Sequence, residues 1–144
     1  TQTETPLIEQ VTEGGYTPTP RRSTLTLYRS GEMVKTNWVG TNNPNDPGTT
    51  TTISLGTLNT PVLDFLVINA NSLTAGTLQF DPNSPVCADS PRTTYTAHSV
   101  KNGVTEAIVF MKNEDCIDKK LTSGEAMNLT RLAKAMESIS NSTL

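Results

Sequence analysis

Apolar and polar residues alternate along two stretches of the chain, and each stretch is interrupted by a turn. The first covers residues 23–38, STLTLYRSGEMVKTNW, with Gly31 at its centre. The second covers residues 93–110, TTYTAHSVKNGVTEAIVF, with Asn102-Gly103 at its centre, a pair that favours the positive φ angles of a tight turn. Because a period of two is the pattern of a half-buried strand, each stretch predicts a β-hairpin.

Two other stretches have helical features. In residues 121–140, apolar residues recur at the three- and four-residue intervals of an amphipathic helix, and Thr122 and Glu125 have the spacing of a capping box. Residues 59–73 contain Thr60-Pro61, a favourable helix start, followed by residues that are apolar on nearly every side. This second pattern predicts a short buried helix, with a central strand as the alternative.

Residues 50–58, TTTISLGTL, predict one more strand, and residues 76–82 a short one. Two hairpins cannot bury a face by themselves, and the amphipathic helix needs a surface to cover. We therefore expect an α+β fold, with a single antiparallel sheet of four to six strands built from two β-hairpins and two helices packed on one face. Residues 1–23 have no hydrophobic period and contain three prolines, so we expect a flexible N-terminal arm or tether before a single domain at 24–144.

Charge and hydropathy exclude some classes of protein. The 144 residues carry a formal net charge of −3, and the only adjacent basic pairs are Arg21-Arg22 and Lys119-Lys120. Nucleic-acid binding needs a concentrated basic face, so we expect none. The longest apolar run, residues 61–68, is too short to span a bilayer. The chain is rich in Thr and poor in Lys, a bias typical of exported proteins.

The chain has only two cysteines, Cys87 and Cys116, and they flank the second predicted hairpin. Because a hairpin returns to the edge from which it started, its two ends lie close together. We therefore predict a Cys87–Cys116 disulfide, on the condition that the chain is in an oxidising compartment. The expected compartment is extracytoplasmic: periplasmic, cell-surface or secreted.

His98, the only histidine, is the one candidate base for a cysteine nucleophile. It falls in the middle of a predicted strand, and no CxxC or HxxxH pair supports a metal site. Phosphate-binding, nucleophile-elbow and zinc-protease motifs are missing as well. We expect a non-enzyme without a cofactor, a metal or catalytic residues.

Two loops are candidates for contact with a partner, which we expect to be another protein. Residues 40–52 are rich in hydrogen-bonding groups, including Asn43 and Asp46. Residues 81–94 contain three prolines, and a rigid loop loses little entropy on binding. Arg92, in the second loop, can enter an acidic pocket, and Trp38 can serve as an aromatic anchor.

These features favour a small exported binding or structural module, held at a membrane or cell surface by its N-terminal arm. The alternative is a secreted inhibitor of a hydrolase, most naturally a protease, that presents loop 81–94 to the active site. A third possibility is a small-molecule site between sheet and helices, although the sequence has few aromatic residues to line one.

Overall fold

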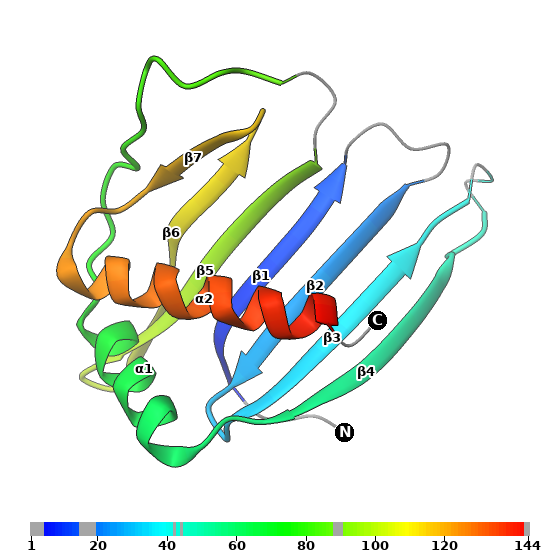
Figure 1. The fold of residues 1–144 in the computed structure, drawn as a ribbon. Coiled ribbons are helices and arrows are strands. Elements are labelled where there is room, and N and C mark those ends of the chain that lie inside the picture. The colour runs from blue at the N-terminus through cyan, green and yellow to red at the C-terminus, as the bar shows by residue number, and fades with distance from the viewer. Residues whose placement is uncertain (1–4, 15–19, 42, 44, 88–90, 143–144) are drawn as a thin grey trace.

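The computed structural model describes residues 5–14, 20–41, 43, 45–87 and 91–142. Within them the chain forms one antiparallel sheet of seven strands, in the order β4-β3-β2-β1-β5-β6-β7, and two helices, α1 and α2 (Figure 1). The α+β class and the single antiparallel sheet are therefore confirmed, whereas four to six strands was too few. The elements are β1 (Pro6–Gly14), β2 (Arg21–Tyr28), β3 (Glu32–Val39), β4 (Thr49–Thr57), α1 (Thr60–Ser72), β5 (Pro91–Lys101), β6 (Val104–Glu114), β7 (Ile117–Lys120) and α2 (Gly124–Ser142).

The central strand, β1, lies in the segment that the sequence indicated was a flexible arm. It pairs with β2 on one side and β5 on the other, and Leu7 and Ile8 are completely buried. The prediction was wrong for residues 6–14 because the strand has an irregular register between Pro6 and Ile8. Such a bulge lets two consecutive residues face the core, which hides the period of two. Residues 1–4 and 15–19 of that segment lie outside the described residues.

Both predicted hairpins are present, as β2–β3 and β5–β6. The turn of the second has Asn102 and Gly103 at positive φ, as its sequence indicated. The sheet is not built from these hairpins alone, because β1, β4 and the short edge strand β7 extend it. Of the short strand expected at 76–82, only Gln79 pairs, in an isolated bridge to Lys120 on β7.

Both predicted helices are present, but each is capped one residue away from the expected position. Asn59 Oδ1 accepts a hydrogen bond from the Val62 amide at 3.2 Å, so Asn59 rather than Thr60 caps α1. Ser123 Oγ accepts one from the Ala126 amide at 3.2 Å, so Ser123 rather than Thr122 caps α2. In both helices a neighbouring side-chain oxygen accepts the capping hydrogen bond, the amide oxygen of Asn59 in α1 and the hydroxyl oxygen of Ser123 in α2.

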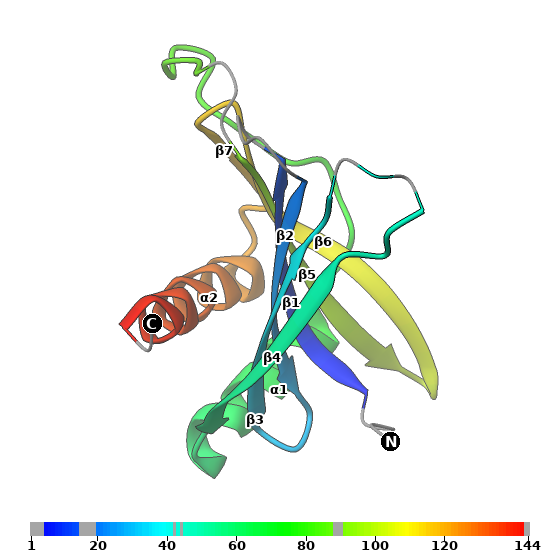
Figure 2. The same ribbon diagram turned by 90° about the vertical axis from the view of Figure 1, so that its right-hand side faces the viewer.

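The two helices lie on the same face of the sheet, as expected (Figures 1 and 2). α2 crosses the strands at mid-height and α1 lies beside it near the lower end of β5. Helix α1 buries only part of its surface, since Phe65 and Ile68 are exposed. Neither described helix is long and apolar enough to cross a lipid bilayer. The fully buried apolar side chains between helices and sheet include Leu7, Ile8, Leu27, Leu66, Leu73, Ala97, Phe110 and Leu129.

We expect β1 to be indispensable for folding. Deleting residues 1–14 removes the strand that lies between β2 and β5 in the described sheet, together with Leu7 and Ile8. The truncated chain should lose its cooperative transition in urea denaturation followed by circular dichroism. In the full chain, Ile8→Ala should lower the free energy of unfolding by about 2–5 kcal/mol, because it leaves a cavity in the core.

Glu13→Ala is the control for this experiment, since it changes a half-exposed side chain of the same strand. It should cost less than about 1 kcal/mol, as expected of an exposed ion pair. A truncated protein with the stability of the full chain would restore the interpretation of residues 1–14 as an arm.

Candidate interaction surface

The face of the sheet opposite the helices is covered by no other element of the described chain, and we call it the open face (Figure 2). Because side chains alternate along a strand, the residues next to each core position in sequence point to this face. Many of them are threonines that lie beside one another on neighbouring strands. One such line across the sheet runs through Thr94, Val11, Thr24, Thr36 and Thr52.

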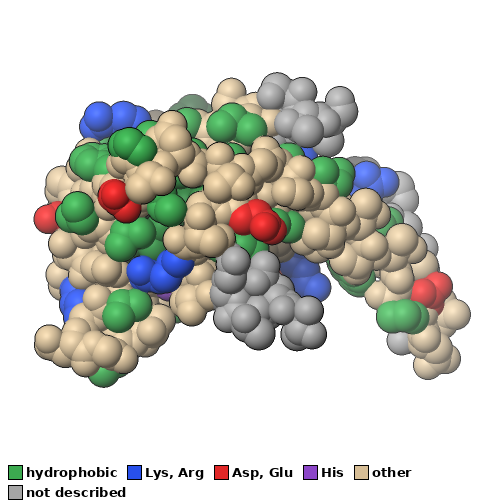
Figure 3. Space-filling model, turned by 90° about the horizontal axis from the view of Figure 1, so that it is seen from below, with side chains coloured by type: hydrophobic (Ala, Val, Ile, Leu, Met, Phe, Trp, Pro, Cys, Tyr) green, Lys and Arg blue, Asp and Glu red, His purple; other side chains and the backbone are tan. Residues whose placement is uncertain are grey.

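The open face is concave. Seen from the lower end of the molecule, the sheet is arched, with a hollow between the β4 side and the part formed by β5 and β6 (Figure 3). A recess of about 370 Å³ lies on this face. It combines hydroxyl groups, one carboxylate, one guanidinium and one indole ring. Its lining residues are Glu9, Val11, Arg22, Thr24, Thr36, Trp38 and Thr50.

We call the end of the sheet at which β1, β3 and β6 finish the loop end. Two of the residues proposed from sequence, Trp38 and Arg92, belong to one line of side chains across this end. Trp38 pairs with Arg22 on β2, Arg22 pairs with Glu13 on β1, and Glu13 pairs with Arg92 on β5. Continuing the register of β5 with β6 brings Glu114 beside Arg92. We call this line, with the two lysines that contact Glu114, the charged row: Trp38, Arg22, Glu13, Arg92, Glu114, Lys112 and Lys119.

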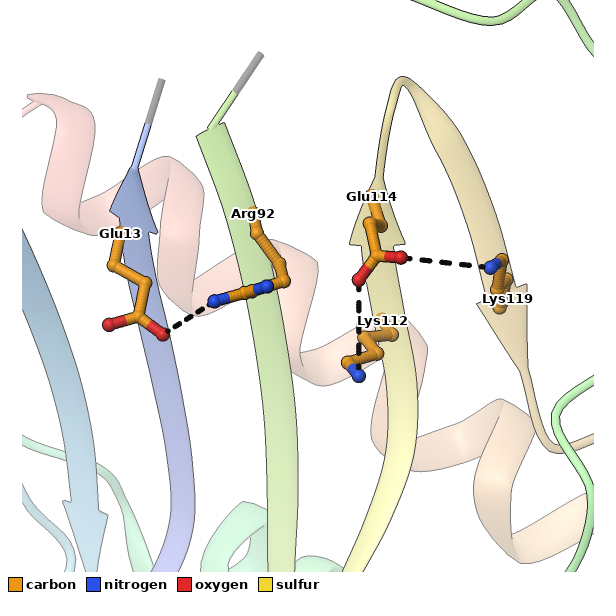
Figure 4. Close-up of polar contacts among 5 residues, drawn as sticks. All are labelled: Glu13, Arg92, Lys112, Glu114 and Lys119. Carbon is orange, nitrogen blue, oxygen red and sulfur yellow. Dashed lines mark hydrogen bonds and ion pairs between the residues drawn. The ribbon is translucent and has the colours of Figure 1, made fainter. Parts of the chain in front are cut away.

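The charged groups of this row contact one another, and the row as a whole keeps a positive net charge (Figure 4). Arg92 Nη2 lies 3.2 Å from Glu13 Oε1. Lys112 Nζ and Lys119 Nζ each lie 3.9 Å from a carboxylate oxygen of Glu114. These pairs are partly exposed, so they contribute little to stability. Arginine and lysine side chains outnumber the glutamates of the row, which leaves a positive surface on a protein whose net charge is −3.

Trp38 joins the charged row to the loop between β3 and β4. Its Nε1 donates a hydrogen bond to the Pro47 carbonyl oxygen at 2.9 Å, and the Arg22 guanidinium lies 5.3 Å from the ring centroid. A guanidinium at this distance from an indole ring is attracted to its face. The indole is therefore held at the rim of the open face, with its position fixed from two sides.

The other two candidates, Asn43 and Asp46, use their side chains within their own loop. Asn43 Oδ1 accepts a hydrogen bond from the Asn45 amide at 3.0 Å, and Asp46 Oδ1 accepts one from the Gly48 amide at 2.9 Å. These are the local turns that Asn and Asp commonly form. Their role as partner contacts stays a prediction, and the structure supplies a local role for each side chain.

The disulfide between Cys87 and Cys116 is confirmed, with a Cα–Cα distance of 5.4 Å. Cys116 lies in the tight turn between β6 and β7, where both Asp115 and Cys116 have positive φ. The Cys87 amide also donates to the Asp115 carbonyl at 2.9 Å, so the end of the long loop is fixed to this turn. The expected loop 81–94 is too long at its end, because residues 91–94 belong to strand β5 and Arg92 therefore lies on a strand. Residues 88–90 of that segment lie outside the described part. Just before the disulfide, Val86 is 72% exposed.

His98 lies far from the disulfide and interacts with a different element. Its Nε2 lies 2.6 Å from Glu9 Oε1 on β1, and the strand rise places it about 20 Å along β5 from Arg92. Both sulfur atoms are bonded to each other, so neither cysteine is a thiol nucleophile. In the described residues, no group of three or more His, Cys, Asp or Glu side chains has the arrangement of a metal site.

Sequence reasoning missed Arg22, Glu13 and Glu114, although a signal for them was present. Arg22 and Trp38 are symmetric about the β2–β3 turn, so a hairpin with Gly31 at its turn places them close together. Glu13 could not be found in this way, because its strand had been interpreted as an arm. The pairing of Glu13 with Arg92 joins residues 79 positions apart in the chain.

The chain matches no protein-family model, no curated protein and no solved structure.

We expect the disulfide to contribute a large part of the stability. Replacing both cysteines by serine should lower the free energy of unfolding by roughly 3–4 kcal/mol, since the bond closes a loop of about 30 residues in the unfolded chain. Urea denaturation of the double variant and of the wild type, with and without reductant, measures this. Rapid alkylation of two free thiols in native, unreduced protein would contradict the bond itself.

Proposed function

We propose that this protein is a small exported, non-catalytic binding module whose open face, at the charged row, contacts an acidic surface of a partner protein. The observation that carries the proposal is the alignment of Trp38, Arg22 and Arg92 in one line across the strands, at the loop end of the concave open face. Tryptophan and arginine are the residues most enriched among energetically dominant contacts in protein interfaces.

The charges of the row support a protein partner over a nucleic acid. Glu13 and Glu114 alternate with the cations, and a continuous phosphate backbone would be repelled at each of these positions. A protein surface can instead place a carboxylate opposite Arg92 or Arg22 and a base opposite a glutamate. Such complementarity sets the choice of partner and the rate of association.

Export is supported by the disulfide, which persists in oxidising compartments and is rare in the cytosol. The tether formed by residues 1–23, which the sequence indicated, is not part of the proposal. Residues 6–14 are the central strand of the sheet, so the segment as a whole cannot act as a spacer.

The test compares variants on the two faces of the molecule. Trp38→Ala and Arg92→Glu change the charged row. Arg131→Glu is the control, since it makes the same charge change as Arg92→Glu but on the exposed side of α2. Proteins from the source cells that crosslink to the wild type and to the α2 variant, but to neither row variant, are the expected partners. For a purified partner, each row change should weaken binding tenfold or more, as expected for a central contact.

Raising the salt concentration should weaken the wild-type complex further, because the contact pairs exposed charges. If the row variants and the α2 variant lose partner binding to the same extent, the charged row is not part of the interface. Unchanged melting temperatures of the variants exclude a general loss of folding.

A second candidate function, inhibition of a hydrolase by loop 81–94, is favoured by the exposure of Val86 beside the disulfide. The side chain is 72% exposed, and the following residue is fixed to the β6–β7 turn by a covalent bond and a backbone hydrogen bond. Figure 2 shows the described part of the loop before the disulfide projecting beyond the end of β7. A projecting, pre-organised loop suits insertion into an active site.

Titration against serine, cysteine and metalloproteases tests this second function. An inhibitor should act at micromolar concentration or below, and Val86→Asp should abolish the effect while Val104→Asp, in an exposed position at the other end of the sheet, should not. No inhibition of any protease class at micromolar concentration would eliminate this candidate and leave the charged-row proposal unaffected.

A further inference from the structure

On the helix-bearing face of the sheet, a recess of about 420 Å³ lies between α2 and the loop end. It is separate from the open face, since the side chains that line it alternate with those of the charged row along the same strands. Most of its lining residues have polar side chains, although apolar atoms make up more than half of its surface. The lining residues are Gln10, Thr12, Ser23, Leu25, Lys35, Pro91, Thr93, Asn113, Cys116 and Glu137.

Two polar side chains of this recess have no partner among the described residues, and one of them has a buried polar atom. Gln10 is only 8% exposed, and its Oε1 is completely buried and accepts no hydrogen bond. The Lys35 side chain is largely covered, at 9% exposed for the residue, and its ammonium forms no ion pair within the described part of the chain. Buried polar groups are nearly always hydrogen-bonded, so the unpartnered Gln10 oxygen, with an unpaired ammonium beside it in the same recess, indicates a ligand.

The recess also contains a fixed carboxylate. The Tyr95 hydroxyl donates a hydrogen bond to Glu137 Oε2 at 2.8 Å, which holds the side chain of Glu137 on α2 over the sheet. Among the described residues, Glu137 Oε1 has no partner. Burial, and then the hydrogen bond to Glu137, raises the pKa of Tyr95, so the hydroxyl stays protonated and keeps donating.

Lys35 and Glu137 thus present opposite charges to the same recess, yet no ion pair joins them in the described structure. A purely anionic ligand would be repelled by Glu137, and a purely cationic one by Lys35. A neutral ligand would leave both charges without a counter-charge. A ligand that carries both charges can pair with the two groups at the same time.

We propose that the recess binds a small zwitterionic molecule, an amino acid or a short peptide. Its carboxylate pairs with the Lys35 ammonium, and its ammonium pairs with the free oxygen of Glu137. A rotation of the Gln10 side chain, which lines the recess, then lets its amide hydrogen-bond to the ligand. The Thr12 and Thr93 hydroxyls, which lie 3.0 Å apart, have hydrogen-bonding capacity left for it as well.

Leu25, Pro91 and the disulfide at Cys116 give the recess an apolar side, which favours an aliphatic or aromatic portion of the ligand. The site is independent of the proposed protein contact, because it lies on the opposite face of the sheet. Failure of one proposal therefore leaves the other unchanged.

The experiment titrates the full-length protein with individual free amino acids and dipeptides, followed by isothermal calorimetry and by the melting temperature. Each compound that binds is compared with its N-acetyl derivative, which lacks the ammonium, and its C-terminal amide, which lacks the carboxylate. We expect binding by zwitterions, with a rise in melting temperature, and a loss of affinity of tenfold or more for both derivatives.

Three variants assign the contacts. Lys35→Met and Glu137→Gln keep the size of the side chain and remove its charge, and Glu137→Gln still accepts the Tyr95 hydrogen bond. Each should weaken binding of the zwitterion tenfold or more. With Lys35→Met, the compound with a free carboxylate should no longer bind more tightly than its C-terminal amide. Glu106→Gln, an exposed position on β6, is the matched control and should leave affinity unchanged.

Two outcomes would overturn the proposal. One is the lack of any heat or melting-temperature change with all free amino acids and dipeptides at millimolar concentration. The other is binding that is equally strong in Lys35→Met, Glu137→Gln and the wild type, which would place the ligand elsewhere. Because both substitutions are isosteric, wild-type melting temperatures without ligand are the expected check that each variant is folded.

Discussion

The pairing of β1 with both β2 and β5 is the interaction on which the rest of the structure depends. The strands β2, β3 and β4 form one consecutive group along the chain, and β5, β6 and β7 form another. Only β1 hydrogen-bonds to both groups, and its buried Leu7 and Ile8 contribute to the core beneath the helices. Without it, neither the continuous concave face nor the recess near α2 would exist, because Val11 lines the first and Gln10 the second.

The alternation of side chains along β1 also gives the sheet two chemically different faces. Gln10 and Thr12 point toward the helices, while Glu9, Val11 and Glu13 point away from them. The helices bury the first set only in part, since α2 crosses at mid-height and leaves the loop end uncovered. One strand thus contributes to two separate surfaces, an exposed one with paired charges and a recessed one with unpaired polar groups.

The disulfide organises the same end of the molecule covalently. It fixes the last described part of the long loop to the β6–β7 turn, next to Pro91 at the start of β5. In a chain with only 5% aromatic residues, such a bond replaces part of the stabilisation that a larger core would supply. The rigid loop end can then present both the charged row and the recess without depending on a rich core beneath them.

The sequence by itself determined the elements whose signals are local. Alternation and Asn-Gly identified the β5–β6 hairpin, the apolar stripe identified α2, and the hairpin geometry brought Cys87 to Cys116. Only the tertiary structure decided the place of β1, because a bulge removed its period and its partners lie far along the chain. It also decided which candidates share a surface. Trp38 and Arg92 meet in one row through pairings with β1, whereas Gln10, Lys35 and Glu137 meet through the packing of α2 on the sheet. Contacts of this kind depend on register and packing between distant segments, and local sequence patterns contain neither.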